Sequence, residues 1–352
     1  MDRYDPARTG YAPDADGPIQ TPDISWQATV ADEDEYVSQL VCSTGTVYAA
    51  TEYTLTAVAA ETGKRRWRTE SFGTLLDYDK PLVVKAGPSL GNEQLLLGSL
   101  PNLYAVDQTD GSARWKHTLR GNVRSILLVG NTVYAVTGIG DNGSLIAIDV
   151  HSGLKRWKTE PSQGIRPYAY AQEYVVGQVI DHDQSIGAVD VSTGARAWKR
   201  SIKISNPLYQ PSLCIANGIV YCGTGPLYAL NLTDGSTRWS YPLGTNDANI
   251  EPVSDGSIVY FVLNDSVHAL DAETGKLRWR VDLSGVASIP TLTDGTLYVG
   301  LEDGLAALDS TTGNERFRVT ISNPGTVSTS PIIAGGTVYL AVDQTLYALT
   351  SQ

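Results

Sequence analysis

The residues of this chain whose type and spacing could support chemistry are five aspartates, each four positions before a glycine. They are Asp107, Asp149, Asp190, Asp271 and Asp309. Carboxylates serve as general acids and bases and as calcium ligands. A reaction needs such a group once, whereas these groups recur along the whole chain. Because an aspartate can also accept backbone N–H bonds inside a turn that a glycine closes, we interpret all five as turn residues.

The other residues that could act in catalysis or metal binding are scattered. The four histidines are His117, His151, His182 and His268. Only His182 stands in a dense polar cluster, Asp181-His182-Asp183, which we interpret as a solvated acidic loop rather than a metal site. No glycine-rich phosphate loop and no serine nucleophile elbow stands out. The sequence therefore predicts no catalytic residue and no metal ligand.

The three cysteines, Cys42, Cys214 and Cys222, do not form a disulfide framework. Cys214 and Cys222 flank the turn signal Asn217-Gly218. A two-residue turn places Cys214 opposite Tyr221 and not opposite Cys222. We expect all three cysteines to be buried free thiols.

The segment that carries the aspartates repeats eight times along the chain. Its alanines are separated by 48, 42, 41, 41, 40, 38 and 41 residues; they are Ala57, Ala105, Ala147, Ala188, Ala229, Ala269, Ala307 and Ala348. One unit, residues 211–241, contains four short strand-like runs separated by turn signals, which predicts a four-stranded antiparallel meander. A period near 40 residues with strand content is typical of a propeller.

All seven tryptophans and one phenylalanine occupy the same position, on the fourth strand of the repeat: Trp26, Trp67, Trp115, Trp157, Trp198, Trp239, Trp279 and Phe317. We expect each ring to lie as a wedge between adjacent sheets, with the indole N–H bonded to a neighbouring carbonyl. The eighth copy stops after residues 346–350, and its missing back half is found at residues 24–29.

These observations predict an all-β fold, an eight-bladed β-propeller of four-stranded antiparallel blades. The N-terminal strand closes the last blade, which removes sheet edges that would otherwise promote aggregation. Residues 1–23 are expected to form an extended strap, and residues 24–352 a single propeller domain. We expect the protein to be a monomer.

Composition excludes some function classes. The net charge is -12 and the pI is about 4.8, which disfavours a nucleic-acid partner. No run of residues is long and apolar enough to span a membrane. The acidic, lysine-poor composition suits a high-salt proteome such as that of a halophilic archaeon. No signal peptide is visible, which leaves two locations open, the cytoplasm or an extracytoplasmic site with the signal removed; of these we favour the second.

The pattern Ala-x-Asp-x-x-Thr-Gly-x-x-x-Trp, seen at residues 269–279, resembles the repeat of the quinoprotein, or PQQ-like, β-propellers. The resemblance covers about residues 24–350. It implies one of two branches. One branch holds alcohol dehydrogenases that bind pyrroloquinoline quinone and Ca²⁺. The other holds smaller propellers without catalysis, of the BamB type.

The resemblance makes specific demands for the enzyme branch. Dehydrogenases of this family use a tryptophan as the floor of the quinone site and carry a disulfide between adjacent cysteines. Every tryptophan of this chain stands at the fourth-strand position instead, and no two cysteines are adjacent. We therefore expect a non-catalytic scaffold without a cofactor. A PQQ- and Ca²⁺-dependent oxidoreductase is the alternative.

A partner is expected at the mouth of the central channel, where the loops that lead into the inner strands converge. The candidate ligand rim consists of Arg120, Arg124, Arg166, Tyr168, Tyr170, Tyr209, Asn249 and Glu251. Mixed arginine, tyrosine and amide side chains suit a protein, peptide or glycan partner. The alternative is that these loop tips are polar only because loops are exposed.

Overall fold

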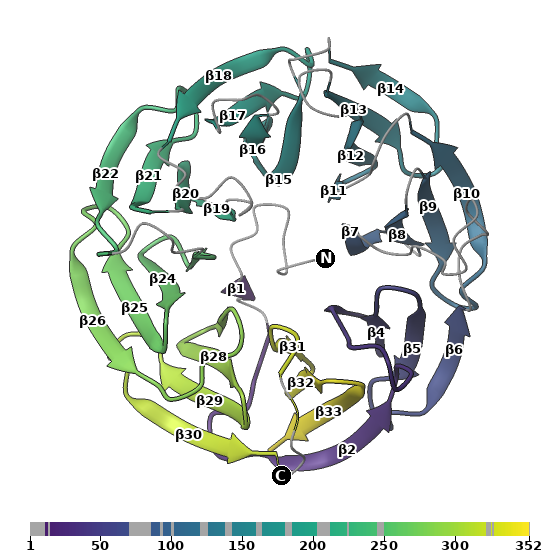
Figure 1. Cartoon of the computed structure of the whole chain (residues 1–352), viewed down its shortest axis with the longest axis vertical. Coiled ribbons are helices and arrows are strands. Elements are labelled where there is room, and N and C mark those ends of the chain that lie inside the picture. The colour runs from purple at the N-terminus through teal and green to yellow at the C-terminus, as the bar shows by residue number, and fades with distance from the viewer. Residues whose placement is uncertain are drawn as a thin grey trace.

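A computed structural model of the chain describes residues 11–12, 15–69, 86–91, 94–99, 102–119, 126–137, 143–159, 164–179, 185–202, 212–223, 225–244, 250–321, 325 and 327–351. The described residues form eight sheets, which stand around a central axis as the blades of a ring (Figure 1). In each blade an antiparallel meander runs from an inner strand beside the axis to an outer strand at the perimeter. The predicted all-β, eight-bladed propeller is confirmed.

The first four blades follow the chain in order. Blade 1 consists of β3 (Gln39–Ser43), β4 (Thr46–Ala50), β5 (Leu55–Ala59) and β6 (Arg65–Thr69). Blade 2 consists of β7 (Ala86–Gly91), β8 (Gln94–Ser99), β9 (Asn102–Asp107) and β10 (Ala113–Thr118). Blade 3 consists of β11 (Ile126–Val129), β12 (Thr132–Thr137), β13 (Ser144–Asp149) and β14 (Lys155–Lys158). Blade 4 consists of β15 (Ile165–Ala171), β16 (Tyr174–Val179), β17 (Ser185–Asp190) and β18 (Arg196–Ser201).

The last four blades continue around the ring. Blade 5 consists of β19 (Leu213–Ala216), β20 (Ile219–Gly223), β21 (Leu227–Asn231) and β22 (Thr237–Tyr241). Blade 6 consists of β23 (Val253–Ser254), β24 (Ile258–Leu263), β25 (Ser266–Asp271) and β26 (Leu277–Asp282). Blade 7 consists of β27 (Thr291–Thr293), β28 (Thr296–Leu301), β29 (Gly304–Asp309) and β30 (Glu315–Thr320), with β1 (Tyr11–Ala12) added inside β27. Blade 8 consists of β31 (Ile332–Ala334), β32 (Thr337–Val342), β33 (Thr345–Thr350) and β2 (Asp23–Thr29).

The pairing of β2 with β33 closes the ring. The two strands are antiparallel, with Asp23 opposite Thr350 and Thr29 opposite Thr345, and Figure 1 shows them side by side at the perimeter. Trp26 lies opposite Ala348, just as Trp279 lies opposite Ala269 in blade 6. The predicted completion of the last blade by the N-terminal strand is therefore confirmed.

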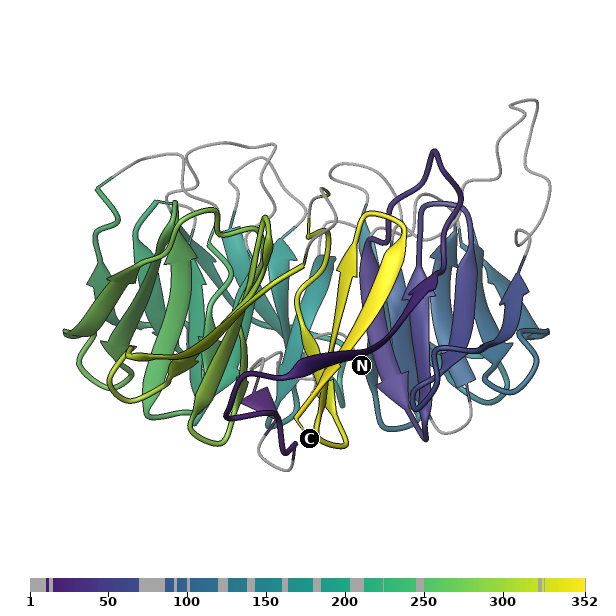
Figure 2. The same ribbon diagram turned by 90° about the horizontal axis from the view of Figure 1, so that it is seen from below.

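The two ends of the disc carry different connections, because successive strands alternate in direction. One end, the turn face, carries the turns between the first and second and between the third and fourth strands of each blade, such as residues 272–276. The other end, the link face, carries the links between blades, such as residues 283–290, and the turns between the second and third strands. Figure 2 shows the disc from its side, with the segment before β2 along its lower face.

The hydrophobic core lies between the blades. One cluster, for example, joins Tyr221 and Leu227 of blade 5 to Val259 and Leu270 of blade 6. Each tryptophan of the repeat lies at such a seam and donates its indole N–H to a turn carbonyl of the next blade. The pairs are Trp26 with Ala60, Trp67 with Gln108, Trp115 with Val150, Trp157 with Val191, Trp198 with Leu232, Trp239 with Ala272 and Trp279 with Ser310.

The glycine of each third-to-fourth-strand turn permits this close contact. Gly275 has a φ of +69°, and a Cβ at this position would lie only 2.7 Å from the Trp239 ring. Any other residue would therefore be strained in its backbone and would collide with the indole. Glycine is therefore needed at this position for two reasons, the backbone conformation of the turn and the close contact with the tryptophan of the neighbouring blade.

The repeated aspartates lie in these turns and accept hydrogen bonds within them. Asp271 accepts bonds from the backbone N–H of Thr274 at 2.9 Å and from its hydroxyl at 2.7 Å. The second carboxylate oxygen pairs with Arg278 at 2.7 Å. Four more aspartates accept the same kind of bond, each from the backbone N–H of a residue two or three positions later. They are Asp107, Asp149, Asp190 and Asp309.

The segment before β2 takes the place of a turn that blade 8 lacks. Because β2 comes from the other end of the chain, no turn joins it to β33. Among the described residues, four other seams have a tyrosine hydroxyl that donates to the turn carbonyl of the next blade, as Tyr260 does to Ser310 at 3.1 Å. In this seam Tyr298 donates to the carbonyl of Pro18 at 2.9 Å, and Gly17 lies against the Tyr298 ring.

The cysteine predictions are confirmed in part. Cys214 lies opposite Tyr221, and all three thiols are free. Cys214 and Cys222 are buried, and burial raises the pKa of Cys222 to about 12. Cys42 is only partly buried, which corrects the expectation for this residue. The division into a strap of residues 1–23 and a propeller of residues 24–352 stays a prediction, since residues 1–10 lie outside the described part.

Candidate functional site

The structure describes four of the eight predicted rim residues: Arg166, Tyr168, Tyr170 and Glu251. The other four lie outside the described residues: Arg120, Arg124, Tyr209 and Asn249. The acidic cluster at residues 181–183 lies outside them as well.

Three of the predicted rim residues belong to a strand and not to the loop before it. Arg166, Tyr168 and Tyr170 all lie on β15, the inner strand of blade 4. Tyr168 is only 6% exposed and packs in the core between blades 4 and 5, so its expected place on the rim is wrong. The cause is a β-bulge between Pro167 and Ala169, which lets Tyr168 and Ala169 pack into the same seam. Arg166 and Tyr170 remain partly exposed, and Arg166 donates to the side chain of Gln178 at 3.4 Å.

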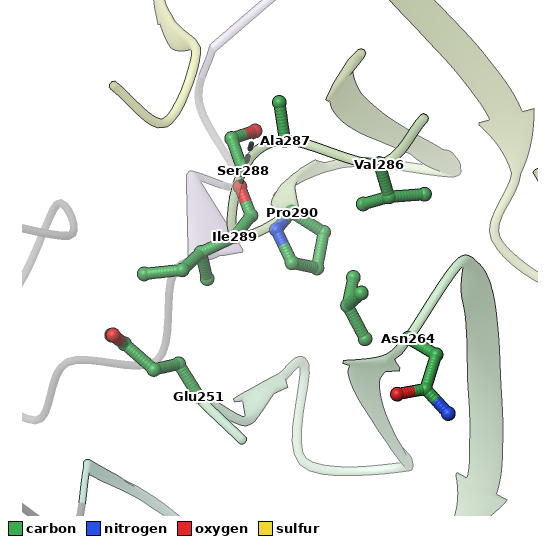
Figure 3. Close-up of a pocket in the computed structure, with 8 residues that line it drawn as sticks. Glu251, Asn264, Val286, Ala287, Ser288, Ile289 and Pro290 are labelled. Atoms are coloured by element: carbon green, nitrogen blue, oxygen red, sulfur yellow. Dashed lines mark hydrogen bonds between the residues drawn. The ribbon is translucent and has the colours of Figure 1, made fainter. Parts of the chain in front are cut away.

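Glu251 lies at a hollow in the link face between blades 6 and 7. The hollow has a volume of about 300 Å³. Its lining comes from the link into blade 6, from the end of β24 with the turn after it, and from the link between blades 6 and 7. Figure 3 shows the side chains around the open space, which are Glu251, Val262, Asn264, Val286, Ala287, Ser288, Ile289 and Pro290.

The longest wall of the hollow is held by backbone bonds to both blades. The N–H of Val286 donates to the Asp265 carboxylate at 3.2 Å, and the N–H of Ala287 donates to the Gly300 carbonyl at 3.0 Å. Ser288 accepts a bond from the N–H of Gly300 at 2.9 Å. The wall therefore exists before any ligand arrives, which lowers the entropic cost of binding.

Among the described residues that line the hollow, Glu251 is the charged one. Glu251 lines it, and the Ser212 hydroxyl donates to one of its carboxylate oxygens at 3.0 Å. The exposed carboxylates Asp265, Glu302 and Asp303 stand on neighbouring turns of the link face. Residues 250–265 and 283–303 contain no lysine and no arginine.

The sequence reasoning named Glu251 but missed the apolar wall beside it. The signal was present in residues 285–290, Gly-Val-Ala-Ser-Ile-Pro, where an inter-blade link lacks charged side chains.

A quinone site of the kind that the PQQ-like resemblance implies does not fit the described residues. All seven tryptophans are wedges, with their indole N–H groups bonded between blades, so none is free to floor a cofactor site. In the part of the chain that the structure describes, no three His, Cys, Asp or Glu side chains cluster closely enough to hold a metal ion. The free cysteines include no adjacent pair.

Comparison with known proteins identifies the family. The family model described as outer membrane protein assembly factor BamB matches residues 51–203, 165–263 and 263–352. The chain belongs to this family of PQQ-like repeat propellers. The described part of the chain contains no apolar helix of the length that a bilayer requires.

Curated BamB proteins are similar over much of their length. The BamB of Escherichia coli K12 is 26% identical over 359 residues, which cover 94% of this chain and 89% of that protein. The BamB of Moranella endobia is 25% identical over 254 residues, or 66% of this chain. In that match the chain spans 64% of the relative, less than two thirds of its length. These relatives are bacterial and lend no support to an origin in a halophilic archaeon.

Solved structures show how widely the fold is shared. BamB from Moraxella catarrhalis superposes with a TM-score of 0.67 at 19% identity, covering 94% of this chain and 98% of that one. Quinohemoprotein alcohol dehydrogenase from Comamonas testosteroni superposes with a TM-score of 0.69 at 14% identity, covering 99% of this chain and 80% of the enzyme. Because BamB and an alcohol dehydrogenase superpose equally well, the fold alone does not choose between an assembly factor and an enzyme.

Proposed function

We propose that this chain is a non-catalytic scaffold of the BamB type, which acts outside the cytoplasm in the assembly of outer membrane proteins and binds a protein partner through its link face. The observation that carries this proposal is the use of every tryptophan as a wedge between blades, which leaves none for a quinone site. The BamB relatives support the same branch of the family.

The link face is the surface that we assign to the partner. Its described part offers the hollow at Glu251 and the partly exposed Arg166, whereas Tyr170 lies at the other end of β15, beside the turn face. Arg120, Arg124, Tyr209 and Asn249 lie outside the described residues and stay predicted contact residues. The turn face carries the repeated aspartate turns, whose side chains are already engaged in bonds within their own blades.

Site-specific photocrosslinking tests the proposal. A photoreactive amino acid replaces Glu302 on the link face in one variant and Glu273 on the turn face in another; both are exposed glutamates. In a cell envelope that contains the outer membrane assembly machinery, we expect crosslinks to a component of that machinery from position 302 only. Equal crosslinking from both faces, or none from either, would contradict the proposal.

Addition of pyrroloquinoline quinone and Ca²⁺ tests the enzyme alternative directly. We expect no change in the absorbance spectrum of the quinone and no dye-linked oxidation of alcohols. A tight quinone complex with turnover would replace the scaffold proposal with the oxidoreductase.

A further inference from the structure

We propose that the turn face carries a second binding site, which takes an extended peptide segment with a Gly-Pro pair. The site is a notch between blades 7 and 8, bounded by Tyr298 and Phe317 at the place where blade 8 lacks a turn. The chain fills the notch with its own residues 15–18, the plug, and a Gly-Pro segment of another protein displaces the plug. This inference goes beyond the proposed function, which concerns the link face.

The notch exists because one aromatic pair of the ring has no turn to contact. In the seam between blades 6 and 7, Tyr260 and Trp279 have ring centroids 5.8 Å apart and both donate to the carbonyl of Ser310. The corresponding pair of blade 7 is Tyr298 and Phe317, with centroids 6.4 Å apart. Blade 8 offers this pair no turn, because β2 and β33 come from the two ends of the chain. The pair is therefore a preformed site for backbone that another segment supplies.

The chemistry of the notch selects a Gly-Pro pair. Tyr298 is fully buried, and its hydroxyl donates to the carbonyl of Pro18 at 2.9 Å. Burial raises the pKa of Tyr298, so the hydroxyl stays a donor. A Cβ at Gly17 would lie 2.2 Å from the hydroxyl oxygen of Tyr298, so only glycine can approach the ring this closely. A proline fixes its own φ and keeps the residue before it extended, which lowers the entropic cost of binding.

The plug is held less firmly than a turn of the ring. Phe317 has no N–H, so the carbonyl of Pro18 receives no indole bond of the kind that joins the other seams. Residues 19–21 are exposed and lie between the buried Pro18 and the buried Pro22. The plug can therefore leave the notch by a rotation at residues 19–21, while β2 stays paired with β33.

The occupant that displaces the plug is a segment of another protein and not of a second copy. In each copy the plug is tethered beside its own notch, at an effective concentration on the order of millimolar. Exchange between two copies would replace every contact with an identical one and would gain nothing. A foreign segment can add contacts at the positions of Asp16 and Ile19, whose side chains are exposed in the plugged state.

A full-length variant with an emptied notch provides the test. Gly17→Ala should keep the plug out, because the added methyl group collides with Tyr298. The probe is a fluorescein-labelled peptide of residues 13–20. One comparison peptide carries alanine in place of the glycine, and another keeps residues 15–18 and has serine elsewhere.

We expect fluorescence anisotropy to show that the Gly17→Ala protein binds the first and the third peptide and not the alanine peptide. The wild type should bind the probe at least ~10-fold more weakly, because its own plug competes at high effective concentration. Asp16→Ala, a change at the neighbouring exposed position, is the control and should behave like the wild type.

Two further changes in the Gly17→Ala protein separate the notch from the ordinary seams. Tyr298→Phe removes the donor to the peptide, and we expect ~5-fold weaker binding, in the range of one net hydrogen bond. Tyr260→Phe removes the same kind of bond where the acceptor belongs to a turn of the ring, and should leave binding unchanged. The peptide should also raise the melting temperature of the Gly17→Ala protein, since it binds the folded state.

The wild type replaces Gly17→Ala if that variant does not fold. The peptide then carries a photoreactive residue at the position of Ile19, which is 60% exposed. Crosslinks should map to blades 7 and 8 and should be absent with the alanine peptide.

The inference is overturned if neither protein takes up the peptide, if the alanine peptide binds equally well, or if Tyr298→Phe leaves binding unchanged. Sedimentation of the wild type supplies one more outcome. A dimer that forms as the concentration rises and that Gly17→Ala abolishes would assign the notch to a second copy, against the proposal. The crosslinks from position 302 test the link face separately.

Discussion

At the scale of single residues, one turn carbonyl joins two blades. The carbonyl of Ala272 accepts bonds from the Trp239 indole at 3.0 Å and from the Tyr221 hydroxyl at 3.2 Å. A carbonyl oxygen has two lone pairs, so both donors are satisfied at once. The turn must hold this carbonyl in place, and the hydrogen bonds of Asp271 do so from within the turn.

Replacement of Asp271 tests this role. Asp271→Ala removes the acceptor for the Thr274 N–H and the partner of Arg278. We expect a loss of about 1 kcal/mol in the free energy of unfolding, as for other side-chain caps of backbone N–H groups. Urea denaturation measures it. Glu273→Ala, in an exposed position of the same turn, is the control and should change little. Equal losses in the two variants would mean that the carboxylate has no special place in the turn.

His268 is a buried residue with an exceptional environment. It is 6% exposed, and its ring stacks on Phe261 with the centroids 4.9 Å apart. Its Nδ1 is buried and has no hydrogen-bond partner among the described residues. Burial lowers the pKa of His268, and the charge of Arg280 lowers it further. The folded state therefore resists protonation of this ring.

A pH series on His268→Phe tests this consequence. Because the folded pKa lies below the unfolded value of about 6.5, the unfolded state takes up a proton first as the pH falls. Stability should then be lost from about pH 6.5 downwards. Phenylalanine keeps the stacking and cannot be protonated, so the melting temperature of the variant should fall less between pH 7 and pH 5. His151→Phe, at an exposed position, should follow the wild type. Parallel curves for all three proteins would refute the prediction.

At the scale of elements, the segment before β2 makes two contributions that can be separated. β2 supplies the outer strand of blade 8 and the Trp26 wedge. The preceding residues supply the Pro18 carbonyl to Tyr298 and add β1 in parallel beside β27, with Tyr11 opposite Leu292. The first contribution closes the ring, and the second adds contacts between blades 7 and 8, which the closed ring already brings together.

Two deletions distinguish these contributions. Removal of residues 1–22 keeps β2 and should lower the melting temperature while unfolding stays cooperative. Removal of residues 1–30 exposes the edge of β33 and leaves the Ala60 carbonyl without its indole donor. An exposed strand edge promotes pairing with other chains, so we expect aggregation or loss of the cooperative transition. Light scattering and calorimetry measure both. An unchanged melting curve for the longer deletion would mean that β2 is not needed for closure.

At the scale of the whole molecule, the repeated aspartates predict the response to acid. Hydrogen bonds from Thr109, followed by Arg114, lower the pKa of Asp107 to about 2. Arg156 holds the pKa of the Asp149 carboxyl below its usual value, and Arg278 does the same for Asp271. Stability that comes from a lowered carboxyl pKa is present above the unfolded value near 3.9 and is lost as the pH falls through the folded value.

We therefore expect the melting temperature to fall below about pH 5 and to go on falling toward pH 2. The triple variant Asp107→Asn, Asp149→Asn and Asp271→Asn should be less stable at pH 6 and should lose less on acidification. Three changes at exposed positions, Asp16→Asn, Glu61→Gln and Glu273→Gln, serve as the control with the same charge difference. A wild type that is equally stable at pH 6 and pH 3 would show that these turns do not govern acid stability.

The ring could be predicted from sequence because its signals repeat. The tryptophans, the turn glycines and the alanines each recur in register, so errors in one copy are corrected by the others. β1 could not be predicted, since two residues that pair in parallel leave no alternating pattern. Nor did a sequence signal reveal the bulge that turns Tyr168 into the core.

The candidate site was less accessible to sequence reasoning, for a physical reason. The hollow is built from three connections that do not repeat, and its shape depends on how they meet. Glu251 could be named as a polar loop residue, but its proximity to Val286 and Ile289 is a property of the assembled ring. Links between blades follow no common pattern, so only the structure brings them together.

The register of the closing strands has a mechanical consequence. Asp23 and Thr350 lie opposite each other, so β2 and β33 leave their sheet at the same end of the blade. Tension applied through the two termini would first pull away the segment before β2, which is held by β27 and Tyr298, and would then peel β2 from β33 bond by bond toward Thr29 and Thr345. Stretched in this way, the molecule should unroll from blade 8 at low force, because the bonds between β2 and β33 break one after another.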